Sequence, residues 1–139
     1  MTADEVIAAA RSCLATPFRH QGRIPGVALD CAGLVVAVAR ALGLDPVDRE
    51  GYARTPAHGV LEQALDSQPC LRRLESKNLQ QPGDVLLMRF DSDPQHLAIL
   101  TADHTIIHSY ANVGACVEHR FSNAWISRVC SVYRFSDLT

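Results

Sequence analysis

The sequence predicts an α+β fold in which helices come first and an antiparallel sheet follows. Apolar residues of the first half recur at helical spacing, whereas the second half contains short β-branched runs separated by turn residues. With 139 residues and 47% hydrophobic content, the chain can bury one core and is too short for a second domain. We therefore expect one domain over residues 1–139, with the N-terminal helices packed on a five- or six-stranded antiparallel sheet.

The first helix is expected over residues 3–14, where the apolar positions share one face. Thr2 and Glu5 fit a capping box at its start, which satisfies backbone N–H groups that a helix leaves free. A loop over residues 17–26, rich in proline and glycine, then leads to the next helix.

The second helix is expected to begin at Cys31, because Asp30 is a good N-cap residue and an apolar run follows it. Gly43 ends this run, as glycine commonly does at a helix C-terminus. A loop over residues 45–56 then carries Tyr52.

The second half is expected to hold a short helix over residues 59–65 and then a series of strands. Asp84 is assigned to the turn before the first strand, because aspartate side chains hydrogen-bond the backbone in turns. The expected strands cover residues 84–90, 96–101, 105–110, 116–121 and 129–135.

Composition argues against several classes of partner. The net charge is −2 and both signs are mixed along the chain, so we expect no surface for nucleic acid or an anionic membrane. No apolar run approaches the ~20 residues needed to span a bilayer, so we expect no membrane insertion. The first residues also lack the basic stretch and apolar core of an export signal, which predicts synthesis in the cytoplasm without a signal peptide.

Five cysteines are present, an odd number without the close spacing of a zinc site or a disulfide framework. This usage favours a reducing compartment at synthesis, with Cys31 free. We expect the other four to be packing residues; they are Cys13, Cys70, Cys116 and Cys130.

Cys31 is the residue with the clearest chemical potential. A thiol in the first turn of a helix lies near free backbone N–H groups and the positive end of the helix dipole. Both favour the thiolate, which predicts a nucleophile. The alternative is a buried cysteine that packs as a small hydrophobic side chain.

His96 and His108 are the candidate bases for such a thiol. Each lies in a β-branched run, and the two runs are separated by a plausible hairpin turn. Antiparallel pairing of the strands would bring the two imidazoles side by side. A thiol, a histidine that takes its proton and a second residue that orients this histidine are the parts of a nucleophilic site. Zinc bound by Cys31, His96 and His108 is the alternative use of the same three residues.

The other histidines have simpler interpretations. His58 and His104 lie in a loop and in a turn, where we expect solvated side chains, and His119 is expected to be exposed or at the rim of a site. Arg19 and Arg23 could meet a substrate carboxylate through bidentate hydrogen bonds, although an exposed arginine often serves solubility alone.

Four sequence segments make a resemblance specific. DCAGLV at 30–35, QQPGDVLL at 80–87, HLAIL at 96–100 and IIH at 106–108 follow the order found in the NlpC family of cell-wall cysteine peptidases, which the chain resembles from about Ile7 to Phe135. This resemblance implies a papain-like fold, no cofactor and no metal. It also implies that Cys31 is the nucleophile, His96 the general base and His108 the residue that orients His96.

A narrower resemblance concerns the branch encoded in phage and prophage tail modules. It rests on TPFRHQGR at 16–23, on Pro25–Gly26 and on the ending from Trp125 to Phe135. It implies a role as a tail-associated wall hydrolase in the virion, with phage tail-tip proteins as partners. The implied substrate is the peptidoglycan stem peptide, cut between D-glutamate and diaminopimelate.

Two positions depart from the family pattern. Ala32 replaces the usual serine after the nucleophile, a change that leaves the backbone N–H in place. Phe18 matches a family tyrosine whose hydroxyl serves the oxyanion. Because a phenyl ring cannot donate, either His20 or Gln21 supplies that hydrogen bond or no side chain does. The expected substrate-binding residues are Phe18, Arg19, His20, Gln21, Asp30 and Tyr52.

Two other functions use the same scaffold. A non-catalytic tail-tip or wall-binding protein would keep the fold without needing Cys31, His96 and His108. An amidase or acyltransferase would keep all three residues and differ only in its pocket.

Overall fold

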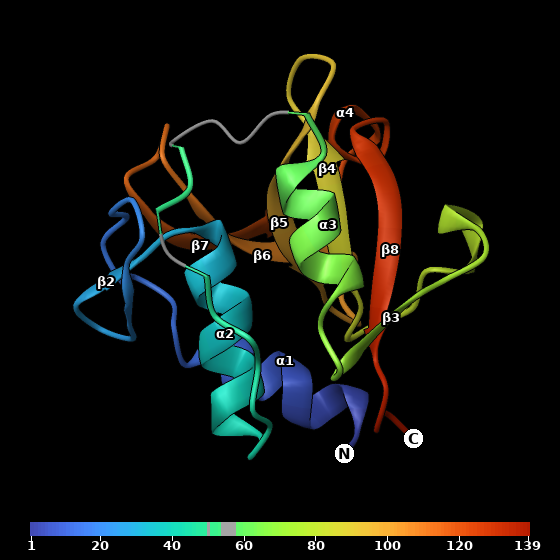
Figure 1. Ribbon diagram of the computed structural model, residues 1–139, viewed down its shortest axis with the longest axis horizontal. Helices are drawn as coiled ribbons and strands as arrows, with labels where there is room; N and C mark the ends of the chain where they lie inside the picture. Colours follow the sequence, from blue (N-terminus) through green and yellow to red (C-terminus); the bar gives the residue numbers. More distant parts are fainter. Residues whose placement is uncertain (50, 54–57) are drawn as a thin grey trace.

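The computed structural model describes residues 1–49, 51–53 and 58–139 (Figure 1). Its helices are α1 (Ala3–Arg11), α2 (Cys31–Ala41), α3 (Val60–Asp66) and α4 (Asn123–Ile126), with one 3-10 turn, η1 (Lys77–Leu79). Its strands are β1 (Arg23–Ile24), β2 (Ala28–Leu29), β3 (Leu71–Arg73), β4 (Val85–Arg89), β5 (Pro94–Leu100), β6 (Thr105–Tyr110), β7 (Ala115–Arg120) and β8 (Val129–Phe135).

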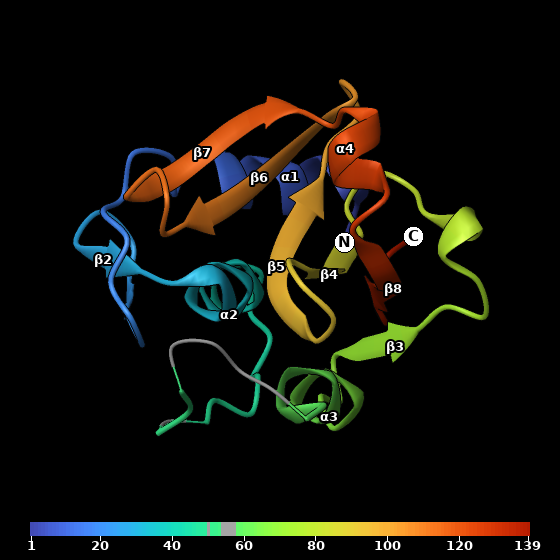
Figure 2. The same cartoon turned by 90° about the horizontal axis from the view of Figure 1, so that it is seen from above.

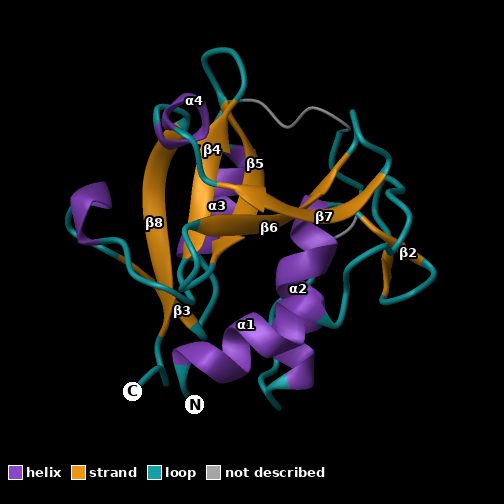
Figure 3. Ribbon diagram, turned by 180° about the vertical axis from the view of Figure 1, so that it is seen from behind, coloured by secondary structure: helices purple, strands orange, loops and turns teal. Residues whose placement is uncertain are grey.

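Six of the strands form one sheet in the order β3-β8-β4-β5-β6-β7, and every neighbouring pair is antiparallel. Figure 2 shows this sheet curving around α2, with α3 beside β3. From behind, α1 crosses α2 near one end of the sheet (Figure 3). The predicted α+β class and the antiparallel sheet are therefore confirmed.

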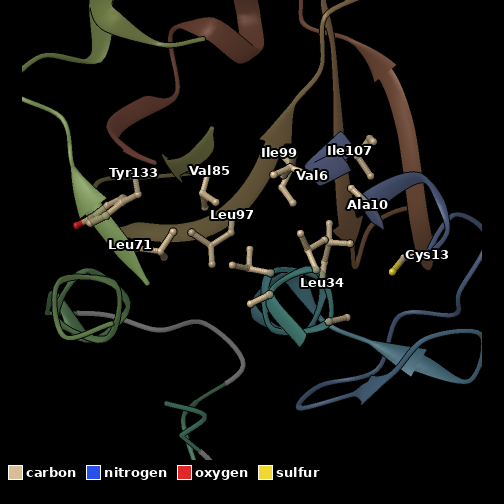
Figure 4. Close-up of a cluster of buried hydrophobic side chains, with 14 of the residues drawn as sticks. Val6, Ala10, Cys13, Leu34, Leu71, Val85, Leu97, Ile99, Ile107 and Tyr133 are labelled. Carbon is tan, nitrogen blue, oxygen red and sulfur yellow. The ribbon is translucent and has the colours of Figure 1, made fainter. Parts of the chain in front are cut away.

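The main core lies between α2 and the sheet. Leu34 of α2 belongs to the same buried cluster as Leu97 and Ile99 of β5, Ile107 of β6 and Val6 of α1 (Figure 4). Burying such side chains contributes roughly 1.5–3 kcal/mol each relative to exposure.

A second cluster covers the other face of the sheet. It contains Ala98 and Leu100 of β5, Ile106 of β6 and Met88 of β4, with Trp125 of α4 packed against it. The side chains of β5 thus alternate between the two clusters, as the period of a strand requires. Strand β5 is buried on both faces from His96 to Leu100, and its register pairs Ile99 with Val85 and Leu97 with Leu87 of β4.

Most element bounds agree with the sequence prediction, and β6 and β8 match it residue for residue. The prediction of a first helix over residues 3–14 was too long, because α1 ends at Arg11 and Ala15 adopts a left-handed backbone with φ 70°. The capping box of Thr2 and Glu5 is confirmed.

Three short strands were not predicted: β3 and the β1–β2 hairpin, which occupies part of the expected loop over 17–26. Of the expected loop over 45–56, residues 50 and 54–56 lie outside the described residues. No helix in the described part of the chain is long and apolar enough to cross a membrane.

Asp84 has the turn role that the sequence predicts. Its Oδ2 atom accepts the backbone N–H of Gln81 at 2.8 Å. The buried carboxylate also accepts two hydrogen bonds from the Arg134 guanidinium, at 2.8 and 2.9 Å. These contacts tie the turn before β4 to β8, which lies next to it in the sheet.

Candidate active site

The start of α2 is fixed by a side-chain cap. The backbone N–H of Gly33 donates to Asp30 Oδ1 at 2.7 Å, so Asp30 is the N-cap and Cys31 the first helical residue, as predicted. At the other end, Gly43 has φ 78° and donates its N–H to the carbonyl of Arg40 at 3.0 Å, as in a helix stop that uses a left-handed glycine.

The Asp30 carboxylate is fully engaged with the protein. Besides Gly33, it accepts the backbone N–H of Gln21 at 2.8 Å, a guanidinium N–H of Arg23 at 2.8 Å and the hydroxyl of Tyr52. Arg23 also bonds Asp48, with Nε to Oδ1 at 3.0 Å. Asp30 therefore joins the start of α2 to two loops, and Arg23, a possible substrate partner from the sequence, is bonded within the protein.

Cys31 is half-buried and titrates differently from what its place on the helix suggests. The pKa of its thiol is raised from 9.0 to about 12. Burial is the largest cause, and the negative charge of the Asp30 carboxylate is the second. The backbone N–H groups of Leu97 and Ala32 act in the opposite direction but are outweighed. The helix start favours the thiolate as expected, but the net preference for a thiolate is wrong here, because desolvation of the charged form dominates.

His96 and His108 are buried and joined by a hydrogen bond. His96 Nε2 lies 2.6 Å from His108 Nδ1, as expected from the same-face positions of the two side chains. Strands β5 and β6 pair at Ile99–Ile107 and Leu100–Ile106 and diverge beyond them, as Figure 2 shows.

The environment of both rings favours neutral imidazole. Burial lowers the pKa of His108 to about 3, and the nearby His119 lowers it as well. Burial likewise lowers the pKa of His96 well below 6.5, with further contributions from His108 and His119. At neutral pH the site therefore holds a thiol and neutral histidines.

His119, expected from the sequence to be exposed or at the rim of a site, is half-buried and belongs to this cluster. Its Nε2 lies 2.7 Å from His108 Nε2, and its Nδ1 lies 2.9 Å from the carbonyl oxygen of Arg120. In the β6–β7 register His108 pairs with Val117 and Ile106 with His119, so the two histidines are diagonal neighbours on one face. Val117 and His119 share one face of the strand predicted after residues 105–110. Pairing of these two strands is the signal in the sequence that could have predicted the contact.

Aromatic rings enclose the histidines. Tyr110 stacks on His108 with ring centroids 5.0 Å apart, and Phe90 lies 4.9 Å from His96. Trp125 of α4 contacts His108 edge-on at 5.0 Å. The rings limit rotation of the imidazoles and exclude water from their faces.

Cys31 and His96 line the same cavity, which has a volume of about 430 Å³. Phe18 also lines it, as do Gln95 and Tyr110. Cys31 borders a second cavity of about 300 Å³, whose lining includes residues of α2 and α3 and also Tyr52. The structure thus places the thiol between two hollows.

The other predicted binding residues lie away from the cavity that holds His96. Arg19 is exposed, while His20 Nε2 and Gln21 Nε2 lie 2.9 and 3.2 Å from the carbonyl oxygen of Tyr52. The side chains of His20 and Gln21 therefore tie the loop before β1 to the segment around Tyr52.

The zinc alternative is not supported by the geometry. Among the described residues, no group of three or more His, Cys, Asp or Glu side chains could hold a metal ion. His96 and His108 direct ring nitrogens at each other at hydrogen-bond distance, so neither of these two nitrogens is free to bind a shared ion. His58 and His104 are exposed, as predicted.

The fold is papain-like, with a cysteine at the start of its central helix and histidines on neighbouring strands. More specifically, the model of the NlpC/P60 family matches residues 15–134, and the chain belongs to this family. No curated protein matches the chain.

Solved structures share the fold at low sequence identity. NlpC1 from Trichomonas vaginalis is 16% identical with a TM-score of 0.69, over 96% of this chain and 44% of that protein. An NlpC/P60 family protein from Bacillus cereus ATCC 10987 is 17% identical with a TM-score of 0.70, over 97% and 40%. The NlpC/p60 domain of the peptidoglycan hydrolase SagA is 18% identical with a TM-score of 0.64, over 95% and 97%. The chain thus spans less than half the length of the first two proteins.

Proposed function

We propose that this chain hydrolyses an amide bond of peptidoglycan stem peptides, with Cys31 as nucleophile, His96 as general base and His108 as the residue that orients His96. The observation that carries the proposal is a thiol and a hydrogen-bonded histidine pair at one cavity, in a member of the NlpC/P60 family. SagA, which has this fold, is named as a peptidoglycan hydrolase, and so is RipB from Mycobacterium tuberculosis.

The protonation states determine how the reaction begins. Because Cys31 holds its proton and His96 is neutral, proton transfer accompanies attack instead of preceding it. His96 takes the thiol proton while Sγ bonds to the substrate carbonyl carbon, and the carbonyl oxygen becomes an oxyanion. The same proton passes to the leaving amine as the C–N bond breaks, which leaves a thioester on Cys31. Water, deprotonated by His96, then cleaves the thioester and restores the thiol.

The oxyanion needs hydrogen-bond donors near Cys31. Backbone N–H groups at the start of α2 are free of helical partners and serve this role in the proposal. Phe18 lines the cavity and has no hydroxyl to add, and the side chains of His20 and Gln21 are bonded to Tyr52. The proposed oxyanion site is therefore a backbone site.

The finer proposal concerns the bond and the biological setting. We infer cleavage between D-glutamate and diaminopimelate, and a role as a phage or prophage tail hydrolase that is made in the cytoplasm and acts at the bacterial wall. Support for this part comes from the segments at 16–23 and 125–135, which resemble the tail-module branch. Tail-tip proteins are the proposed partners.

The test is mass spectrometry of muropeptides released from diaminopimelate-type peptidoglycan. Wild-type protein is compared with Cys31→Ala, and with Cys130→Ser as a matched control, since Cys130 is another half-buried free cysteine that lies on β8. We expect new products that end at D-glutamate from the wild type and from Cys130→Ser, and none from Cys31→Ala.

Other outcomes have defined meanings. Products with different ends would contradict the proposed bond and would indicate an amidase or a peptidase of another specificity. Products from Cys31→Ala at the wild-type rate would overturn the role of Cys31. No products from any variant, with wall binding retained, would favour a structural tail component.

A further inference from the structure

An unbroken series of hydrogen bonds connects His96 to the main chain of β7. His96 Nε2 lies 2.6 Å from His108 Nδ1, and His108 Nε2 lies 2.7 Å from His119 Nε2. The series ends where His119 Nδ1 lies 2.9 Å from the carbonyl oxygen of Arg120. We call the three side chains the histidine series.

The carbonyl end of the series fixes the position of each proton. A carbonyl oxygen only accepts, so Nδ1 of His119 carries the N–H, and a neutral imidazole has only one. Nε2 of His119 must then accept the N–H of His108 Nε2. This leaves Nδ1 of His108 as the acceptor for the N–H of His96 Nε2.

The consequence appears at the cavity. With its proton on Nε2, His96 has a lone pair on Nδ1. Nδ1 of His96 has no hydrogen-bond partner among the described residues. In the same residues every buried polar side-chain atom does have a partner, so an atom without one is not buried. Nδ1 is therefore accessible, on a residue that lines the cavity of Cys31. The base needed for a thiol is the form that the series selects.

We propose that His119 is a positioning residue that holds His96 in the tautomer with a bare Nδ1. The inference extends the proposed function of Cys31 and His96 by one residue beyond His108. His119 touches neither Cys31 nor the cavity that holds His96, so it acts only through His108.

Packing supports this role. Trp125 lies 5.2 Å from the His119 ring and 5.0 Å from the His108 ring, so one indole restrains both imidazoles. Burial keeps His108 neutral, which is the state in which a single proton per ring makes the series directional.

The test replaces His119 and reads the tautomer of His96 directly. Phenylalanine keeps a ring but removes both nitrogens, whereas glutamate offers only acceptor atoms at a similar reach. Ring ¹⁵N chemical shifts of histidine-labelled protein at about pH 8 distinguish a proton on Nε2 from one on Nδ1. His104→Asn is the matched control, because His104 is exposed, lies outside the series and has a left-handed backbone that asparagine tolerates.

We expect His96 to carry its proton on Nε2 in the wild type, in His119→Glu and in His104→Asn, and to show a mixture of both tautomers in His119→Phe. With a stem-peptide substrate, His119→Phe should lower kcat about tenfold at unchanged KM. This factor corresponds to the loss of one hydrogen bond that favours the His96 tautomer with its proton on Nε2. His119→Glu should stay within a few-fold of the wild type.

Two results would overturn the proposal. One is a proton on Nε2 of His96 and full kcat in folded His119→Phe. The other is an equal loss in His119→Phe and His119→Glu, which would indicate a structural role. The tautomer is measured without substrate, so the proposal is tested even if the chain does not cleave peptidoglycan.

Discussion

At the scale of single residues, Cys31 shows two opposing effects on one thiol. A helix N-terminus stabilises a nearby negative charge by about 0.3–1 kcal/mol. A pKa that rises from 9.0 to about 12 corresponds to roughly 4 kcal/mol against the thiolate, at about 1.4 kcal/mol for each pKa unit. Burial is the larger effect, so the proposed nucleophile rests as a thiol, and in the proposed mechanism it depends on His96 to take its proton.

This balance predicts the ultraviolet spectrum of the free protein. Thiolate absorption assigned to Cys31, taken as the difference between wild type and Cys31→Ser, should stay absent up to about pH 10 because the thiol pKa is near 12. Titration of the difference spectrum measures it. A thiolate signal at neutral pH would show an ion pair with His96 and would contradict the neutral resting state.

The buried histidines predict a loss of stability in acid. The pKa of His108 is about 3 in the folded chain and near 6.5 when unfolded, so the unfolded state binds more protons below pH 6.5. Stability therefore falls as the pH drops from about 6.5 toward 3. For His108 the expected cost at pH 5 relative to pH 8 is about 2 kcal/mol, and the lowered pKa of His96 acts in the same direction.

Urea unfolding at the two pH values measures this change. His108→Gln cannot be protonated and should show a smaller difference between them, even if it is less stable overall. An equal pH dependence in wild type and His108→Gln would show that His108 does not carry the effect.

At the scale of elements, the start of α2 is placed by close backbone contact as well as by its cap. A Cβ on Gly33 would lie 2.0 Å from the carbonyl oxygen of Gly22, so only glycine allows the helix to approach the loop before β1. Ser109 holds the other side, because its hydroxyl donates to the carbonyl of Leu29 at 2.7 Å. Cys31 is thus set between the loop and β6.

Gly33→Ala should therefore move the start of α2 and reduce both stability and activity. We expect a loss of about 3 kcal/mol or more, as for an overpacked site against backbone, measured by chemical unfolding and peptide hydrolysis. Gly43→Ala is the matched variant at the other end of the helix. There a Cβ meets open space, and the left-handed backbone with φ 78° costs about 1 kcal/mol without loss of activity. Equal effects of both variants would argue against the contact with Gly22.

At the scale of the whole molecule, the sheet has a hydrophobic cluster on each face. Leu97, Ile99 and Ile107 face α2, whereas Ala98 and Ile106 face the side covered by Trp125. Residue-by-residue alternation therefore decides which cluster each side chain joins. By the same alternation His96 and His108 share the side of Ala98 and Ile106, where Trp125 lies 5.0 Å from His108.

Truncation in the main cluster should destabilise the entire fold. Ile99 is fully buried, and Ile99→Ala should cost about 2–5 kcal/mol through the lost burial and the cavity that remains. Val113→Ala, at a side chain that is 58% exposed, should change stability by less than about 0.5 kcal/mol. Thermal or urea unfolding measures both, and similar values would mean that Ile99 is not part of a rigid core.

Local patterns in the sequence are sufficient for much of this architecture. The bounds of β6 and β8, the cap at Asp30 and the shared face of His96 and His108 follow from periodicity and capping, which depend on neighbours along the chain. Strand β3 was missed because its three residues depend on pairing with β8, about sixty residues away.

Only the tertiary structure decides the chemistry of the site. The sequence places Cys31 at a helix start, but the pKa of its thiol depends on the segments that desolvate it. It places His119 on a strand, but its contact with His108 depends on the β6–β7 register. It also offers His20 and Gln21 to the substrate, whereas the fold bonds them to Tyr52. Backbone periodicity is a local property, while desolvation and side-chain contact depend on distances between segments that are remote in the chain.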